Sequence, residues 1–192
     1  MERELETIRL YYDDPYMKEF DAVVLNCIPD GKRYRIKLNR TAFYPEGGGQ
    51  PCDLGRLGSE PVLDVQEENG IIYHTVAHSL TVTAPVVGRI DWARRFDHMQ
   101  QHSGEHIVSG MLCETYHCDN VGFHMGADVV TIDYNADIPW EGVLEIERRA
   151  NRYIQENHTP RIWWPPREDF PFLSYRSKKA IEGPLRLTEF PG

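Results

Sequence analysis

The chain has 192 residues, a net charge of −9 and 41% hydrophobic residues, which is the composition of an ordinary soluble globular protein. This length allows one large core or two small ones. No apolar run reaches membrane-spanning length and the charged N-terminus lacks a signal-peptide core, so we expect a cytoplasmic protein with no membrane partner. The four cysteines form no CxxC pair, which favours reduced thiols over a dense disulfide framework.

Charge is distributed unevenly along the chain. Residues 97–147 hold ten acidic residues, no Lys or Arg, and five of the eight histidines, whereas residues 148–186 hold nine basic residues against four acidic ones. An acidic segment rich in histidine favours binding of a cation, and a basic segment suits contact with phosphates. Two solvated faces without any ligand would give the same pattern.

The first 90 residues have the pattern of short strands separated by turns. The predicted strands are 23–28, 33–38, 62–65, 71–76 and 86–91. Turn signals stand between them at Pro29-Asp30-Gly31 and at Asn69-Gly70, and apolar and basic residues alternate in 33–38. This spacing predicts a small β-barrel or sandwich as a first domain over residues 1–90.

Residues 91–192 have a different pattern, typical of an α+β domain. Apolar residues at a period of 3.6 predict a helix over 93–116, and a second helix ends near His158. Asp137 and Pro139 resemble the N-cap and first turn of that second helix. Further strands are predicted at 129–134, 161–164 and 185–190. The expected fold class is therefore α+β, with a small β-barrel followed by two long helices packed on an antiparallel sheet.

Two histidines lie four residues apart in the first predicted helix. His102 and His106 are on one helix face, where two imidazoles can bind one transition-metal ion such as zinc, and His98 lies one turn earlier. Because Glu105 stands directly before the second histidine, the segment is not the HExxH motif of a metalloprotease, and we expect its carboxylate to point away from a metal-bound water. Two ordinary surface or core histidines are the alternative. Gly104 between them costs about 1 kcal/mol relative to Ala in a helix, which indicates either a close approach to the backbone or loose packing.

A glycine-rich segment precedes the helix by some forty residues. Gly47, Gly48 and Gly49 provide a flexible backbone whose N–H groups a ligand can approach, and Glu46 and Gln50 flank them with an acceptor and an amide. The segment lacks the Lys and the helix-opening context of a phosphate-binding loop or dinucleotide fingerprint. It is either a ligand-binding loop that reads a small polar group or a barrel turn with a bulge.

Three segments occur together, FYPEGGGQPCDLG at 43–55, DWARRFDHMQQHSGEH at 91–106 and VGFHMGADVVTIDY at 121–134. In this order they resemble the freestanding alanyl-tRNA editing proteins, which are similar to the editing domain of alanyl-tRNA synthetase. The resemblance covers nearly the whole chain. It implies a β-barrel followed by an α+β domain of the type found as the second additional domain of threonyl- and alanyl-tRNA synthetases. It also implies hydrolysis, in trans, of the ester that joins serine or glycine to tRNA for alanine.

The resemblance further implies that His102 and His106 are the first pair of zinc ligands. The second pair in the family is a Cys-x-x-x-His motif, expected directly after a segment like 185–192, and the sequence ends at Gly192. We therefore expect a fragment in which zinc occupancy is partial or absent. Five other residues are candidates for an added ligand: His98, Cys113, His117, Cys118 and His124.

Roles follow from the resemblance for the remaining candidates. The catalytic residues would be His102, His106 and Gln50, and the substrate would be bound by Glu46, Gly47, Gly48, Gly49, Gln50, Arg94 and Arg95. The glycine N–H groups would stabilise the oxyanion, and Glu46 and Gln50 would read the serine hydroxyl. Arg94 and Arg95 would steer the tRNA acceptor end, or simply solvate the start of the helix.

Two other functions remain open from the sequence. The chain would be a non-catalytic module that binds tRNA acceptor ends, or an inactive fragment that lacks half of the zinc site. A small-molecule metallohydrolase is disfavoured because HExxH and a third carboxylate ligand are missing.

Overall fold

The computed structural model describes residues 6–173, 175 and 185–191, which form two compact units. The first unit comprises residues up to Gln101 together with His124–Val129, and the second comprises His102–Phe123 and the residues from Val130 onward. The long helix α1 (Trp92–Tyr116) contributes its first turns to the first unit and the rest to the second. The units are therefore divided at a different place from the predicted domains, 1–90 and 91–192, whose assignment stays a prediction.

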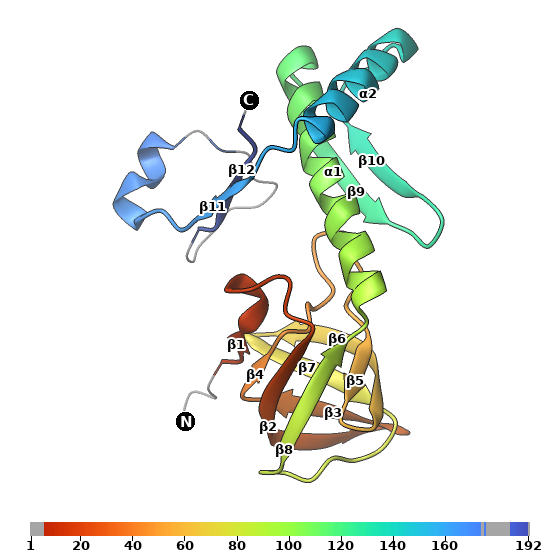
Figure 1. Cartoon of the computed structure of the whole chain (residues 1–192), viewed down its shortest axis with the longest axis vertical. Helices are drawn as coiled ribbons and strands as arrows, with labels where there is room; N and C mark the ends of the chain where they lie inside the picture. Colours follow the sequence, from red (N-terminus) through yellow and green to blue (C-terminus); the bar gives the residue numbers. More distant parts are fainter. Residues whose placement is uncertain (1–5, 174, 176–184, 192) are drawn as a thin grey trace. The chain divides into compact units, whose positions relative to one another are not determined.

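Six strands of the first unit form a closed antiparallel barrel (Figure 1). They are β2 (Glu19–Asp30), β3 (Arg33–Leu38), β5 (Gly55–Leu57), β6 (Glu60–Glu68), β7 (Ile71–Val76) and β8 (Pro85–Ile90), in the order β2-β3-β7-β6-β5-β8. Outside the barrel, β1 (Ile8–Arg9) pairs in parallel with β4 (Arg40–Thr41), and the short 3₁₀ helix η1 (Leu10–Tyr12) follows β1.

The barrel closes around an apolar core. Its most deeply buried side chains include Ile36, Leu38, Phe43, Leu57 and Ile72, each 0% exposed. The long strands β2 and β6 each shift register once against their partners, and such bulges bend a strand so that a sheet can curve and close. Neighbouring strands are joined by tight turns at the positions that the sequence predicts for the β2–β3 and β6–β7 hairpins.

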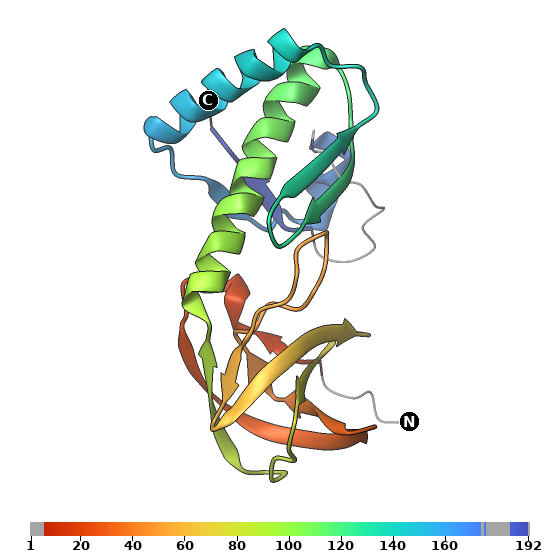
Figure 2. The same ribbon diagram turned by 90° about the vertical axis from the view of Figure 1, so that its right-hand side faces the viewer.

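The second unit is built on two helices and two small sheets (Figure 2). The strands β9 (Asn120–Met125) and β10 (Val130–Tyr134) form one two-stranded sheet, and β11 (Arg161–Trp163) pairs antiparallel with β12 (Leu187–Glu189). The helix α2 (Trp140–Gln155) packs on the C-terminal half of α1 through a small core of Leu112, Cys118 and Ile146. A 3₁₀ helix, η2 (Arg167–Phe172), lies between β11 and β12 in the sequence.

The structure contains both helices and strands, with a large antiparallel sheet and two long helices, and this confirms the prediction of a mixed α and β fold. The expected N-cap at Asp137 is wrong, since α2 is preceded by Pro139 at the N-cap position with an extended backbone (φ −66°, ψ 149°) and no side-chain cap bond. The Pro139 carbonyl instead accepts the N–H groups of Gly142 and Val143, at 2.9 and 3.1 Å. Among the described helices, none has the length and apolarity needed to cross a membrane.

Candidate functional site

The two histidines predicted to share a helix face do so in the structure. The imidazole rings of His102 and His106 lie on α1 with their centroids 4.9 Å apart and their planes 21° from parallel. The His102 side chain is half-buried, and that of His106 is 47% exposed. Both rings are therefore near enough to one another, and near enough to solvent, to bind one ligand together.

A carboxylate joins this pair. One ligand atom from each of His102, Glu105 and His106 lies within 4.8 Å of the other two, and Glu105 Oε2 is 3.3 Å from His106 Nδ1. The expectation that Glu105 points away was wrong, because Glu105 follows His102 by three residues and that spacing returns to the same helix face. The spacing of three residues between His102 and Glu105 is enough to predict this placement, but the comparison with HExxH draws attention to a different position.

The other oxygen of the Glu105 carboxylate belongs to a hydrogen-bond network of polar side chains. Ser109 Oγ donates to Glu105 Oε1 at 2.7 Å, and Asn120 Nδ2 donates to the same oxygen. Ser109 Oγ also lies 2.8 Å from the hydroxyl of Tyr134, whose pKa is raised by burial to about 12. Glu105 is only 7% exposed, so these contacts replace most of its hydration.

Each imidazole also has an aromatic neighbour. The ring of Phe123 lies 5.4 Å from that of His102, and the ring of Phe190 lies 6.0 Å from that of His106. An apolar ring beside each imidazole lowers the local dielectric constant and strengthens electrostatic interactions of the pair.

The donor set fits zinc. Imidazole nitrogen and carboxylate oxygen are both ordinary zinc ligands, and catalytic zinc sites take three protein ligands and leave a fourth position open. His102, Glu105 and His106 supply three such groups within 4.8 Å of one another, in the acidic part of the chain.

The other candidate ligands have different surroundings. His98 is 6% exposed in the first unit, where burial lowers its pKa, and His124 also belongs to that unit. Cys118 is part of the apolar core of the second unit. Cys113 and His117 have the Cys-x-x-x-His spacing, but Cys113 packs against that core, and His117, just past the end of α1, has a left-handed backbone (φ 50°).

The glycine segment forms a tight two-residue turn in the first unit. Gly47 and Gln50 exchange backbone hydrogen bonds of 3.1 Å, and Gly48 and Gly49 between them have φ values of 63° and 85°. Two successive positive φ angles are the mark of a type I′ turn, for which glycine is best suited. The Gly47 N–H is committed within the turn, and the Gly49 carbonyl accepts the N–H of Met125 at 2.9 Å.

The residues that flank this turn differ in exposure. Glu46 is exposed and its Oε2 accepts a hydrogen bond of 3.2 Å from Gln66, whereas Gln50 is only 6% exposed. Glu46, the three glycines and Gln50 thus form one group in the first unit, and His102, Glu105 and His106 form another in the second.

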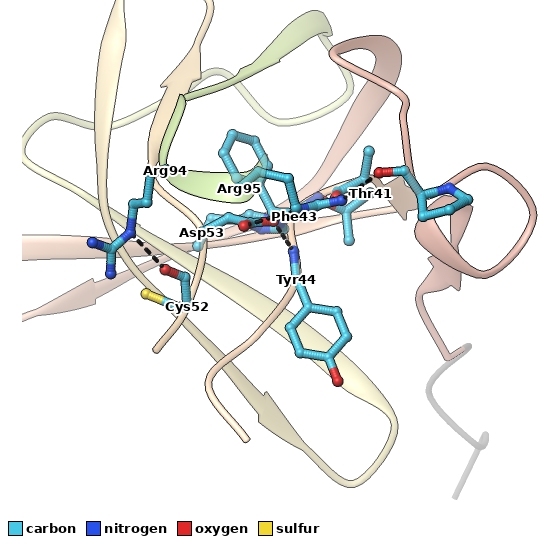
Figure 3. A network of polar contacts seen from close by, with 10 residues as sticks. Thr41, Phe43, Tyr44, Cys52, Asp53, Arg94 and Arg95 are labelled. Carbon is cyan, nitrogen blue, oxygen red and sulfur yellow. Dashed lines mark hydrogen bonds and ion pairs between the residues drawn. The ribbon is translucent and has the colours of Figure 1, made fainter. Parts of the chain in front are cut away.

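Arg95 has a structural environment that the sequence did not reveal (Figure 3). Its guanidinium forms an ion pair with the carboxylate of Asp53, donates to the carbonyls of Pro15 and Ala42, and is 3% exposed. A side chain so buried and bonded is not available to a ligand, so the predicted contact of Arg95 with a substrate is contradicted. Arg94 is half-buried and donates to the Cys52 carbonyl at 3.1 Å.

Comparison with known proteins gives two relatives with similar names. Over 155 residues, 76% of this chain, it is 36% identical to the alanyl-tRNA editing protein AlaX-L of Pyrococcus horikoshii. It is 34% identical over 195 residues to the alanyl-tRNA editing protein Aarsd1 of Danio rerio. The chain is a relative of the alanyl-tRNA editing proteins. The predicted resemblance is thereby confirmed.

The same region occurs in larger enzymes. The chain is 42% identical over 174 residues, 85% of its length, to the alanine–tRNA ligase of Pyrococcus furiosus, and residues 15–94 match the family model of class II (A) tRNA synthetases. The aligned regions make up 38% of the AlaX-L protein, 47% of the Aarsd1 protein and 19% of the ligase. The chain therefore spans less than half the length of these relatives.

Proposed function

We propose that this chain hydrolyses the ester bond of mischarged aminoacyl-tRNA in trans, with serine or glycine attached to tRNA for alanine as the substrate. The observation that carries the proposal is the group of His102, Glu105 and His106, whose ligand atoms lie within 4.8 Å of one another. The names of the relatives, two of them alanyl-tRNA editing proteins, support the substrate class.

In this proposal zinc is the cation that the group binds. When bound, the metal supplies Lewis-acid polarisation of the ester or orients the substrate for attack by water. His102 and His106 present ring nitrogens, and Glu105 adds negative charge beside them. Because an aminoacyl ester is already reactive, holding ester and water together accounts for much of the required acceleration.

The residues proposed to read the amino acid are Glu46 and Gln50. A polar group that hydrogen-bonds the serine hydroxyl is left unpaired by alanine, and this disfavours hydrolysis of the correctly charged tRNA. Variants Glu46→Ala and Gln50→Ala test this role separately from the metal group, because they are expected to reduce the preference for seryl-tRNA while leaving zinc binding unchanged.

The deciding experiment is deacylation of seryl-tRNA and glycyl-tRNA for alanine by the 192-residue chain, with alanyl-tRNA as the correctly charged comparison. We expect zinc-dependent release of serine or glycine, and a loss of about 100-fold or more in the His102→Ala variant, as for removal of a metal ligand. His78→Ala is the matched control, since His78 is an exposed histidine paired with Glu60 in the other unit.

Two results would contradict the proposal. Serine release that is equally fast in His102→Ala, or in the presence of a chelator, would remove the metal group from the reaction. Binding of the acceptor end without any hydrolysis would instead support the non-catalytic tRNA-binding module.

A further inference from the structure

A groove of about 290 Å³ lies between α1 and α2, wholly inside the second unit. Its lining is apolar except for Glu147 and Asn151, which lie on α2. We propose that a second copy of this chain covers the groove, with the α2 helices of the two copies paired antiparallel. This inference goes beyond the proposed hydrolysis and does not depend on it.

Gly104 forms part of the groove lining, and the sequence leaves open whether another group approaches its backbone or the packing there is loose. Apart from its neighbours in the helix, nothing among the described residues lies within 4 Å of a Cβ added at this position. A glycine in a helix interior is less favourable than alanine, and no contact with the described part of the chain explains it here. The open space beside Gly104 leaves room for a side chain of another molecule.

The outer face of α2 continues the apolar surface of the groove. Trp140, Val143 and Ile154 are 68%, 37% and 57% exposed, and spacings of three and eleven residues place them on one helix face. Ile146 on the neighbouring stripe is buried and packs with Leu112 of α1. The helix α2 therefore has more apolar surface than α1 covers, and removing this surface from water favours association.

Charge favours a second copy as the occupant. The chain has a net charge of −9, so two copies repel each other on average. The segment 140–155 is an exception, because three arginines balance its three acidic residues and all follow them in the sequence. An antiparallel pair places the acidic half of each helix beside the basic half of the other, whereas a parallel pair would place like charges together. The six residues are Glu141, Glu145, Glu147, Arg148, Arg149 and Arg152.

The two polar residues of the groove lining indicate the register of the pair. Glu147 and Asn151 are exposed and lie one helical turn apart, and a carboxylate accepts the hydrogen bond that an amide NH₂ donates. A two-fold axis midway between them directs Glu147 at the partner's Asn151, and Asn151 at the partner's Glu147. Two-fold interfaces between identical copies are self-complementary in this way.

The same register brings apolar groups together toward the ends of the pair, with the partner's Val143 opposite Ile154. The helix α2 starts near the end of α1 and runs back along it (Figure 2), and a Cβ added at Gly142 would meet the Tyr116 hydroxyl. Ile154 therefore lies at the end of the groove that holds Gly104, where there is room for the partner's Val143.

The first measurement is the mass of the 192-residue chain in solution, by sedimentation equilibrium over a wide range of concentration. We expect the mass to rise from 22.3 kDa toward twice that value as the concentration increases. A mass that stays at 22.3 kDa at every concentration would overturn the proposal and leave the groove to a different partner. Growth past the dimer would also overturn it, because a two-fold contact closes.

Substitutions at Asn151 test the register. Asn151→Asp places a carboxylate against the partner's Glu147, and Asn151→Lys places an ammonium there. Because each change acts twice in a two-fold pair, we expect the dissociation constant of the dimer to rise at least about tenfold in the first variant and to fall by a similar factor in the second.

Gln101→Asp and Gln101→Lys are the matched controls. They make the same changes in net charge at an exposed amide of α1 that does not line the groove, so we expect little effect on association. Shifts as large as those at Asn151 would show that net charge alone controls association, and would overturn the proposal.

The orientation of the two helices has a test of its own. In the double variant Glu147→Lys/Asn151→Asp, an antiparallel pair places opposite charges against each other, whereas a parallel pair places like charges together. We expect this variant to associate at least as tightly as the parent chain. Dissociation of the double variant would contradict the antiparallel arrangement.

Gly104→Leu tests the groove itself. The new side chain occupies the open space without meeting the described fold at its Cβ, so the melting temperature should be kept or raised. The dimer should nevertheless weaken at least about tenfold, because the partner's Val143 loses its place. Association that is unchanged or tighter in a folded Gly104→Leu variant would show that no partner enters the groove.

Discussion

Histidine is used in opposite ways in the two units of this protein. His74 in the barrel is 0% exposed, and its ring nitrogens contact Thr41 Oγ1 at 2.8 Å and the Ile36 carbonyl at 3.1 Å. His102 and His106 in the second unit are more exposed and stack on one another beside a carboxylate. The environment of a histidine, and not its presence, therefore separates a structural role from that of a candidate ligand.

Carboxylates show the same contrast. Asp53 is fully buried, and both of its oxygens are taken by Arg95 and by the backbone N–H of Tyr44. Glu105 is nearly as buried but directs one oxygen at a partly exposed imidazole. The partners of Asp53 all come from the first unit and leave neither oxygen available, whereas Glu105 directs one oxygen at the candidate metal ligand His106.

The largest expected effect is on the barrel pair. Asp53→Asn leaves the Arg95 guanidinium buried without a counter-charge, and breaking a buried ion pair in this way costs about 3–5 kcal/mol of unfolding free energy. Urea unfolding followed by circular dichroism measures it. Glu19→Gln is the control, since the exposed Glu19–Arg89 pair at 2.7 Å is worth less than about 1 kcal/mol. Equal losses in the two variants would contradict the distinction.

The Asp53–Arg95 pair shows why part of the structure could not be predicted. The two residues are 42 positions apart, and nothing local in the sequence pairs them. In the sequence, Arg95 therefore resembles an exposed base at the start of a helix, which would either steer an acceptor end or solvate the helix. Long-range contacts between short segments also explain why β1, β4 and β5, of two or three residues each, were not predicted.

Local periodicity, in contrast, was sufficient for the elements that carry the candidate metal ligands. The helix predicted over 93–116 is α1 (Trp92–Tyr116), and the strands at 33–38 and 71–76 have the predicted bounds. Helical spacing alone also placed His102 beside His106. The same spacing contained Glu105, which was missed because a motif of another enzyme class was used as the reference.

The second prediction concerns pH and uses His74. Burial lowers its pKa from 6.5 to about 4, so between these values the unfolded chain binds a proton that the folded barrel does not. Stability therefore falls as the pH decreases, by about 3 kcal/mol in total between pH 6.5 and pH 4. Urea midpoints measured across this range should decline more steeply in the parent protein than in His74→Leu. Parallel curves for the two proteins would show that His74 is not the group responsible.

A smaller effect is expected in the glycine turn, where backbone conformation can be separated from contacts. Gly48→Ala forces a side chain into the left-handed region at φ 63° and should cost about 1 kcal/mol, although nothing lies within 4 Å of the added Cβ. Gly47→Ala is the matched control, since its surroundings are equally open and its φ is not positive. Thermal unfolding of both variants is the measurement, and an equal loss would indicate a steric cause instead.

The smallest change in stability is expected for His106→Ala, although this variant should have a large effect on zinc binding. His106→Ala removes a half-exposed side chain from α1, and Glu105 keeps its contacts with Ser109 and Asn120, so the unfolding free energy should change by less than about 1 kcal/mol. Zinc affinity should nevertheless fall below detection, since one of only two imidazoles of the group is gone. His74→Ala should do the reverse, lowering stability by about 3 kcal/mol through lost packing and the loss of the contacts with Thr41 and Ile36, while leaving zinc affinity unchanged. If both variants lowered stability to the same extent, the second unit would be using its histidines as the barrel does, to hold its own fold together.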